Sequence, residues 1–420
     1  MPTALRRTLG LSDAVTIGLG SMIGAGVFAV WGPATAAAGG WVLPALAVAA
    51  VVAVCNALSS SALAVRYPSA GGTYVYGRER LGEVWGFLAG WCFVVGKTAS
   101  CAAMAMTVGA YLVPGAERVA AVTAILLVTG LNLLGVRRSV GASRAIVAVV
   151  LCALTGVLVA ALWPRAGSGM ALELGRVVGG DGAPDAHGVL QGAGLLFFAF
   201  AGYARIATLG EEVRDPVRVI PRAVVVALAV VLVLYLTVGV AVLGVLGPDA
   251  VAGSAAPVAD TAAVLWGADL AWVVRAAAGL AALGALLNLV LGISRTAMAM
   301  ARDGNLPRRL ATVSRTAAVP RTAEVAVGAV VLLVVLVADL RGAIGFSSFG
   351  VLLYYAVANA AAFTVRDQWR GGAVVPVLGL LGCLTLAAAL PSSSVIGGGT
   401  VVLLGLAVHL LRRHQRGAAP

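Results

Sequence analysis

The sequence predicts an all-α integral membrane protein with about 12 transmembrane helices. Apolar residues make up 61% of its 420 positions and charged residues only 11%, and the mean hydropathy is +1.01. Soluble domains carry about 25% charged residues. Apolar runs of roughly 17 to 25 residues, each able to span ~30 Å of hydrocarbon as a helix, follow one another along the chain. Arginine-rich loops alternate with arginine-poor loops along the chain, and this pattern predicts which side of the membrane each loop faces.

The expected spans are separated by short loops, except for one long polar loop at 165–189. A signal peptide is not expected, because the first run is too long and lacks a small-residue cleavage site. The spans are 14–38, 41–65, 81–112, 117–136, 143–163, 190–212, 221–247, 269–302, 322–340, 342–365, 372–391 and 394–412.

Basic residues fall mainly on one side of this arrangement. Of the 29 basic residues, 22 lie in the loops of one side and 5 in those of the other, which leaves Lys97 and Arg205 within spans. The positive-inside rule makes the arginine-rich side cytoplasmic, with both termini inside. The net charge of +12 therefore indicates orientation in a cell (plasma) membrane, and we expect a multi-pass protein without a nucleic-acid partner.

The first span contains an interruption at membrane depth. Glycines at Gly20, Gly24 and Gly26 stand within one short stretch that would have to be helical in lipid. Backbone that leaves the helix is tolerated there only inside protein or beside a watery cavity. We therefore predict a binding site at this break. The alternative is a close helix contact through small residues, since Gly20 and Gly24 have the spacing of such a motif.

The sixth span contains a second interruption, around Gly202 in the segment 197–205. Five helices that start inside must be followed by five that start outside, so the two groups have inverted topology. Paired broken helices in inverted repeats are typical of secondary transporters with their site at the repeat interface. We therefore expect a first repeat (1–164), an extracellular loop (165–189), a second repeat (190–366) and two further helices with a cytoplasmic tail (367–420).

Four stretches resemble the amino acid permease branch of the amino acid-polyamine-organocation (APC) superfamily. They are 20–28, 66–74, 197–221 and 299–307, in this order and spacing. The resemblance implies the LeuT-type five-plus-five inverted-repeat fold, with helices 1 and 6 discontinuous. It also implies that amides of the first break hold the substrate carboxylate and that carbonyls of the second break hold its amine. Helix N-termini favour anions in the same way. Ala25 stands where many relatives have a small hydroxyl residue.

The resemblance and the two breaks together give the candidate site residues. Phe198 takes the position of the family's aromatic gate. The expected substrate-binding residues are Ser21, Ile23, Gly24, Ala25, Gly26, Lys97, Phe198, Ala199, Ala201 and Gly202. The expected coupling or gating residues are Lys97, Phe198, Tyr203, Arg205 and Ser294.

Lys97 is the only lysine of the chain and lies about halfway along the third span. An ionisable group at the bilayer midplane costs ~2.5–3.5 kcal/mol on insertion scales and marks function by default. All 17 acidic residues fall in loops or at span ends, so Lys97 is the candidate proton carrier. The alternatives are that the Lys97 side chain extends to the membrane interface or that it pairs with a neighbouring polar group. Relatives with a lysine on helix five offer no direct parallel, because 147–152 is apolar here.

We predict a secondary active amino acid transporter that works by alternating access, with proton-coupled symport of a neutral or small amino acid. The lysine charge would repel a cationic substrate. The alternatives are an uncoupled amino acid or polyamine exchanger and a non-transporting substrate sensor. An enzyme is not expected, because the spans hold no paired acids, HExxH or Ser/His/Asp set. No cofactor or metal is expected, since the five cysteines lack metal-ligand spacing.

Overall fold

The helical, membrane-spanning character of the chain is confirmed by its computed structural model. The structure describes residues 7–68, 71–135, 140–163, 177, 185–313, 319–366 and 372–417. Within these ranges, nine helical stretches are long and apolar enough to cross a membrane. Three shorter helices of 16 or 17 residues, α7, α15 and α17, fall on further predicted spans. Most of the predicted loop at 165–189 lies outside the described residues, as do residues 69 and 70.

All twelve predicted spans coincide with helices to within a few residues at either end. The helices are α1 (Leu11–Met22), α2 (Gly26–Ala29), α3 (Trp31–Ala38), η1 (Gly39–Trp41), α4 (Val42–Arg66), α5 (Thr73–Leu81), α6 (Glu83–Leu112), α7 (Glu117–Leu133), α8 (Val140–Leu162), α9 (Ala186–Phe200), η3 (Ala201–Tyr203), α10 (Ala204–Ala207), α11 (Pro216–Leu246), α12 (Pro248–Gly253), α13 (Pro257–Trp266), α14 (Ala271–Arg302), η4 (Arg308–Ala311), α15 (Arg321–Val337), α16 (Leu340–Phe363), α17 (Val374–Ala389) and α18 (Ser392–Gly417).

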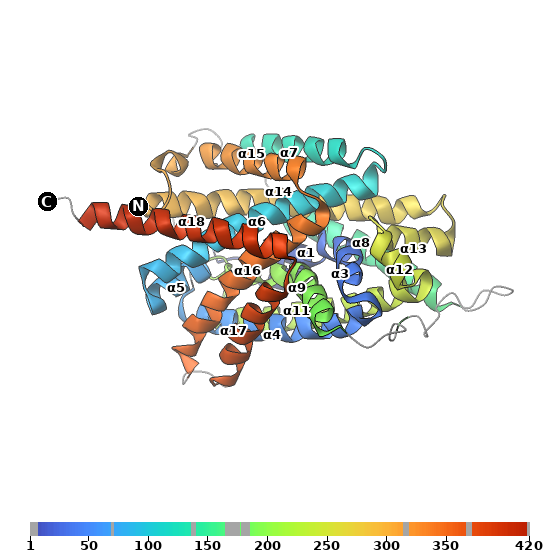
Figure 1. Cartoon of the computed structure of the whole chain (residues 1–420), viewed down its shortest axis with the longest axis horizontal. Helices are drawn as coiled ribbons and strands as arrows, with labels where there is room; N and C mark the ends of the chain where they lie inside the picture. The colour runs from blue at the N-terminus through green and yellow to red at the C-terminus, as the bar shows by residue number, and fades with distance from the viewer. Residues whose placement is uncertain are drawn as a thin grey trace.

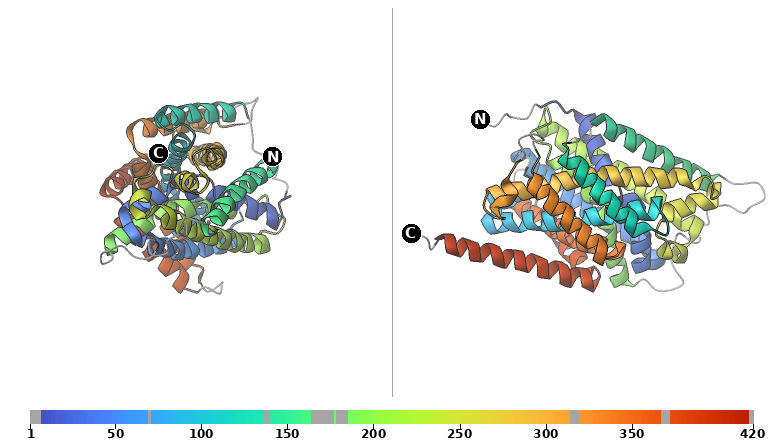
Figure 2. Two further views of the ribbon diagram at one scale, coloured as in Figure 1. Left: turned by 90° about the vertical axis from the view of Figure 1, so that its right-hand side faces the viewer. Right: turned by 90° about the horizontal axis from the view of Figure 1, so that it is seen from above.

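The long helices α6, α14 and α18 run along the long axis of the molecule (Figure 1). Helix α6 packs against both α14 and α16 and so lies inside the bundle, whereas α18 runs along its outside (Figure 2). The short helix α5 and the C-terminal end of α18 lie at one end, and α12 and α13 lie at the opposite end (Figure 1). These three short helices were not predicted, because their sequences are too short to give a membrane-length apolar run.

Small residues allow the inner helices to approach closely. A Cβ atom added to Gly350 of α16 would lie 2.9 Å from the Cα of Gly96 in α6. Ser100 and Ser347 share a hydrogen bond of 2.6 Å across the same contact. This contact fixes the middle of α6, which carries Lys97, against the second half of the chain.

Candidate functional site

Two interruptions of the helical backbone lie at the centre of the candidate site. Helix α1 ends at Met22 and α2 begins at Gly26, with the three residues between them in a bend. In the second half, α9 ends at Phe200, and a single 3₁₀ turn leads into the four-residue helix α10. Both interruptions lie where the sequence places them.

The two interruptions touch through their glycines. A Cβ atom on Gly26 would lie 2.8 Å from the Cα of Ala199. A Cβ atom on Gly202 would lie 2.5 Å from the carbonyl carbon of Ser21 and 2.7 Å from the amide nitrogen of Met22. The first break therefore packs directly on the second. This is the close approach expected of small-residue packing, but packing alone does not account for the helix ending at Met22.

The first break presents unpaired backbone amides. Among the described residues, the amides of Gly24, Ala25 and Gly26 have no backbone acceptor. All three residues are buried. Three successive amide donors at the start of a helix form a site that suits an anion such as a carboxylate.

Tyr235 of α11 joins the two breaks. Its hydroxyl lies 2.7 Å from the carbonyl oxygen of Met22, the last residue of α1, and 3.0 Å from that of Ala199. The side chain is almost fully buried. One phenol hydroxyl thus satisfies carbonyls that the interruptions release, a role that the sequence analysis did not assign to it. The signal in the sequence is a single tyrosine within a run of valines and leucines.

Tyr235→Phe should lower both the stability and the substrate affinity of the protein. The variant leaves the two buried carbonyls without this donor, at a cost of about 1–3 kcal/mol. We expect a lower melting temperature in detergent and a smaller ligand-induced shift. Thr237→Val, which removes an exposed hydroxyl from the same helix, is the matched control. Equal melting temperatures for Tyr235→Phe and the parent would contradict this role.

Lys97 reaches the second break. Its Nζ atom lies 3.2 Å from the carbonyl oxygen of Ala201, and the hydroxyl of Tyr355 lies 3.4 Å from the same oxygen. The lysine is only 8% exposed, so it does not extend to the membrane surface. An amine of the protein therefore occupies one of the carbonyls that the sequence analysis assigned to the substrate amine.

Comparison with known proteins identifies the family. The family model described as amino acid permease matches residues 9–408. This chain belongs to the amino acid permease family. It is 56% identical over 416 residues to an uncharacterized transporter of Mycobacterium tuberculosis, covering 98% of this chain and 93% of the relative. It is also 26% identical over 459 residues to the branched-chain amino acid permease of Bacillus subtilis, covering 98% and 95%. The vacuolar cationic amino acid transporter 2 of Arabidopsis thaliana is 29% identical over 397 residues, covering 86% of this chain and 60% of the relative. The predicted APC membership is confirmed.

The remaining candidate residues of this permease lie at different distances from the breaks. Phe198 is buried in the last turn of α9, and Tyr203 is buried with its ring stacked on Tyr355, 5.0 Å between centroids. Ser21 is half-buried and donates to the Ile17 carbonyl within α1. Ile23 is buried in the first break and Ala201 in the second, and Ala199 is buried in the last turn of α9.

Two of the predicted gating residues do not point into the contact between the breaks. Arg205 follows the second break in α10, is exposed and donates to Thr208. Ser294 is buried in α14 and donates to the Val290 carbonyl one turn earlier. Its position beside Asn132 and Glu324 makes it part of a separate polar cluster.

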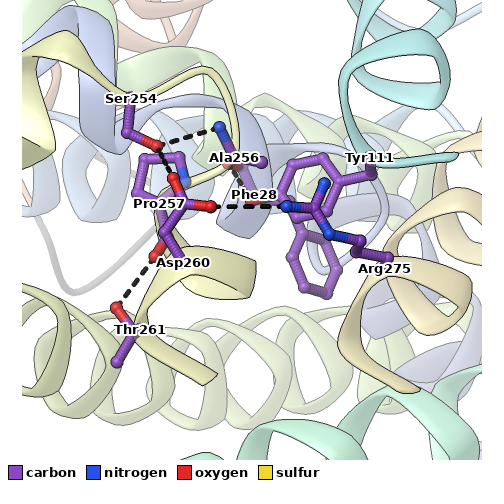
Figure 3. A network of polar contacts seen from close by, with 8 residues as sticks. All are labelled: Phe28, Tyr111, Ser254, Ala256, Pro257, Asp260, Thr261 and Arg275. Atoms are coloured by element: carbon purple, nitrogen blue, oxygen red, sulfur yellow. Dashed lines mark hydrogen bonds and ion pairs between the residues drawn. The ribbon is translucent and has the colours of Figure 1, made fainter. Parts of the chain in front are cut away.

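The permease has a polar network near the α12 and α13 end, which we call the outer cluster (Ser254, Asp260 and Arg275). Arg275 of α14 lies 3.4 Å from the carboxylate of Asp260 in α13, and Ser254 donates to the same carboxylate at 2.5 Å (Figure 3). Beside it, Tyr111 donates to the carbonyl of Phe28 at the end of α2. The outer cluster thus ties the short helices to α14 next to the first break.

A second network, the inner cluster (Tyr74, Arg78, Asp303 and Asn305), lies at the opposite end. Tyr74 and Arg78 of α5 both donate to Asp303 beyond the end of α14, and Asn305 donates to Tyr74. Burial, together with the Asp303 carboxylate, raises the pKa of Tyr74 to about 12. The hydroxyl therefore remains a donor at neutral pH and holds α5 to the end of α14.

Proposed function

We propose that this permease carries a neutral amino acid together with a proton by alternating access around the two breaks. The observation that carries the proposal is the direct contact between the two breaks, with Lys97 hydrogen-bonded to the Ala201 carbonyl of the second break. The three unpaired amides of the first break match the carboxylate of an amino acid zwitterion, and the carbonyls of the second break match its amine.

Lys97 supplies the exchangeable proton in this proposal. The ammonium of Lys97 donates to the carbonyl of Ala201 and so stabilises the second break in the arrangement that holds the substrate. Substrate then binds more tightly when Lys97 is protonated, and by linkage substrate binding favours the protonated form of Lys97. The proton on Lys97 is the coupled one, because it crosses the membrane with the substrate and leaves on the same side.

The charge of Lys97 also bears on the substrate. A charged lysine beside the pocket disfavours arginine and lysine as cargo. The buried walls of the breaks are apolar, with Ile23, Phe198 and Ala199 among them. Neutral aliphatic amino acids fit both features. One relative is named for cationic amino acids and another for branched-chain amino acids, so a binding measurement must compare both classes of substrate.

The two clusters at the ends are the contacts that alternating access would break in turn. The outer cluster holds α13 to α14, and the inner cluster holds α5 to the segment after α14. In our proposal the permease lies in the plasma membrane. The arginine-rich end, which carries the inner cluster, faces the cytoplasm, and both termini lie on the same side.

A binding screen tests the substrate class. The purified permease is heated in detergent with each of the twenty amino acids and with polyamines, since a ligand that binds the native state raises the melting temperature. We expect neutral aliphatic amino acids to give the largest shift. A larger shift with arginine, lysine or a polyamine would contradict the proposed cargo and favour the exchanger alternative. Binding without uptake into liposomes would favour the sensor alternative.

A further inference from the structure

A buried glutamate lies away from the two breaks, between three helices. Glu324 is in the first turn of α15 and is 0% exposed. Its sequence position at a span end gave no sign of this burial. Neither of its carboxyl oxygens has a hydrogen-bond partner among the described residues. Such a group is costly unless it takes up a proton or gains a donor.

Uncharged polar side chains of α7 and α14 surround Glu324. The hydroxyl of Ser294 and the amide of Asn132 lie beside the carboxyl without meeting hydrogen-bond geometry. Asn132 of α7 donates to the Leu287 carbonyl of α14, and its own side-chain oxygen has no donor within the described part of the chain. Thr129, one turn earlier on α7, has a buried hydroxyl that also lacks a partner there.

The helix register brings these groups together. A Cβ atom added to Gly328, one turn after Glu324 on α15, would lie 2.7 Å from the Thr129 hydroxyl oxygen. The face of α7 that carries Thr129 and Asn132 is therefore the face that meets α15. Ser294 approaches from α14, where its hydroxyl proton is used by the Val290 carbonyl. Several buried polar groups thus meet beside a carboxyl group that has no hydrogen-bond partner among the described residues.

Charged or titratable groups lie on α14, η4 and α6, which pack on α15, whereas α7 faces this place with the uncharged Thr129 and Asn132. The exposed Arg295 of α14 attracts the carboxyl, and η4 carries the exposed Arg308 and Arg309. From α6, the buried Cys101 interacts electrostatically with both Lys97, one turn earlier, and Glu324.

We propose that Glu324, with Asn132, Thr129 and Ser294, forms a second proton-binding site of the permease. A proton on the carboxyl removes a buried negative charge that has no hydrogen-bond partner among the described residues, and it supplies an O–H donor for the unpartnered side-chain oxygen of Asn132. This inference rests on the proton coupling proposed above.

Glu324→Gln tests the site because glutamine keeps the size of the side chain but cannot release a proton. Infrared spectroscopy of the purified permease in deuterated buffer follows the carbonyl band of a buried protonated carboxylic acid during a pH titration and on addition of substrate. We expect this band in the parent and in Lys97→Met, and we expect its loss in Glu324→Gln. Glu83→Gln, at an exposed first-turn glutamate of α6, should keep the band.

Transport measurements give the second readout. Glu324→Gln should still bind substrate and exchange it across the membrane, but it should not accumulate substrate in response to a proton gradient, whereas Glu324→Asp should retain part of that response. Full gradient-driven accumulation by Glu324→Gln, or persistence of the infrared band in this variant, would overturn the proposal.

A sodium-dependent rise in melting temperature that Glu324→Gln abolishes would also overturn the proposal, because the oxygen cluster would then bind a metal cation. If the parent shows the band at Glu324 but no proton-driven uptake, the proposed coupled transport fails while Glu324 remains a proton-binding site. If the parent shows proton-driven uptake but no such band, the second site fails alone.

Discussion

Lys97→Met should abolish the response of amino acid uptake to a proton gradient while leaving the permease folded. Methionine fills nearly the same space as lysine without a titratable group. The variant also frees the carbonyl of Ala201, which Lys97 contacts at 3.2 Å, for the substrate amine. We therefore expect facilitated exchange to continue and accumulation against a gradient to cease, as measured with labelled amino acid in liposomes.

Lys97→Arg separates the effect of the positive charge from the effect of proton release. Arginine keeps the positive charge and a donor toward Ala201 but does not release a proton in proteins. It should bind substrate with an affinity that does not depend on pH, and it should also fail to couple. Unchanged proton dependence in Lys97→Met would remove Lys97 from the mechanism, whatever its effect on affinity.

Gly202→Ala should disrupt the site from the backbone. The added methyl group would lie 2.5 Å from the Ser21 carbonyl carbon and 2.7 Å from the Met22 amide nitrogen, and neither atom belongs to a flexible side chain. The two breaks must separate to accommodate it. We expect loss of the ligand-induced thermal shift and of uptake, with a lower melting temperature.

Gly399→Ala in α18 is the control for this substitution, because no atom lies within 4 Å of a Cβ placed there. It should bind and transport like the parent and gain a little helix propensity. If Gly202→Ala kept the parent's affinity, the contact between the two breaks would not define the binding site.

Much of the fold could be predicted from the sequence because membrane physics is restrictive. An apolar run must be helical in lipid, so the run 221–247 predicts most of α11, and glycines at Gly24 and Gly202 mark where the helix stops. The short helices α5, α12 and α13 gave no such signal, since they have only 9, 6 and 10 residues and none contains a membrane-length apolar run.

Contacts between distant residues could not be predicted in this way. Nothing in the local sequence of Tyr235 indicates that its hydroxyl reaches both Met22 and Ala199, because that depends on how α11 crosses the breaks. The burial of Glu324 was missed for the same reason. Its position in the first turn of α15 suggests an exposed end, and only the packing of α7 and α14 shows that it is covered.

The most direct test of the central claim is uptake of a labelled neutral amino acid such as leucine by permease-containing liposomes with an imposed inward proton gradient. The account predicts that leucine accumulates above its equilibrium level, that a protonophore returns it to that level, and that Lys97→Met never exceeds it. Leucine entry that ignores the gradient and requires preloaded internal amino acid would contradict proton coupling and establish an exchanger.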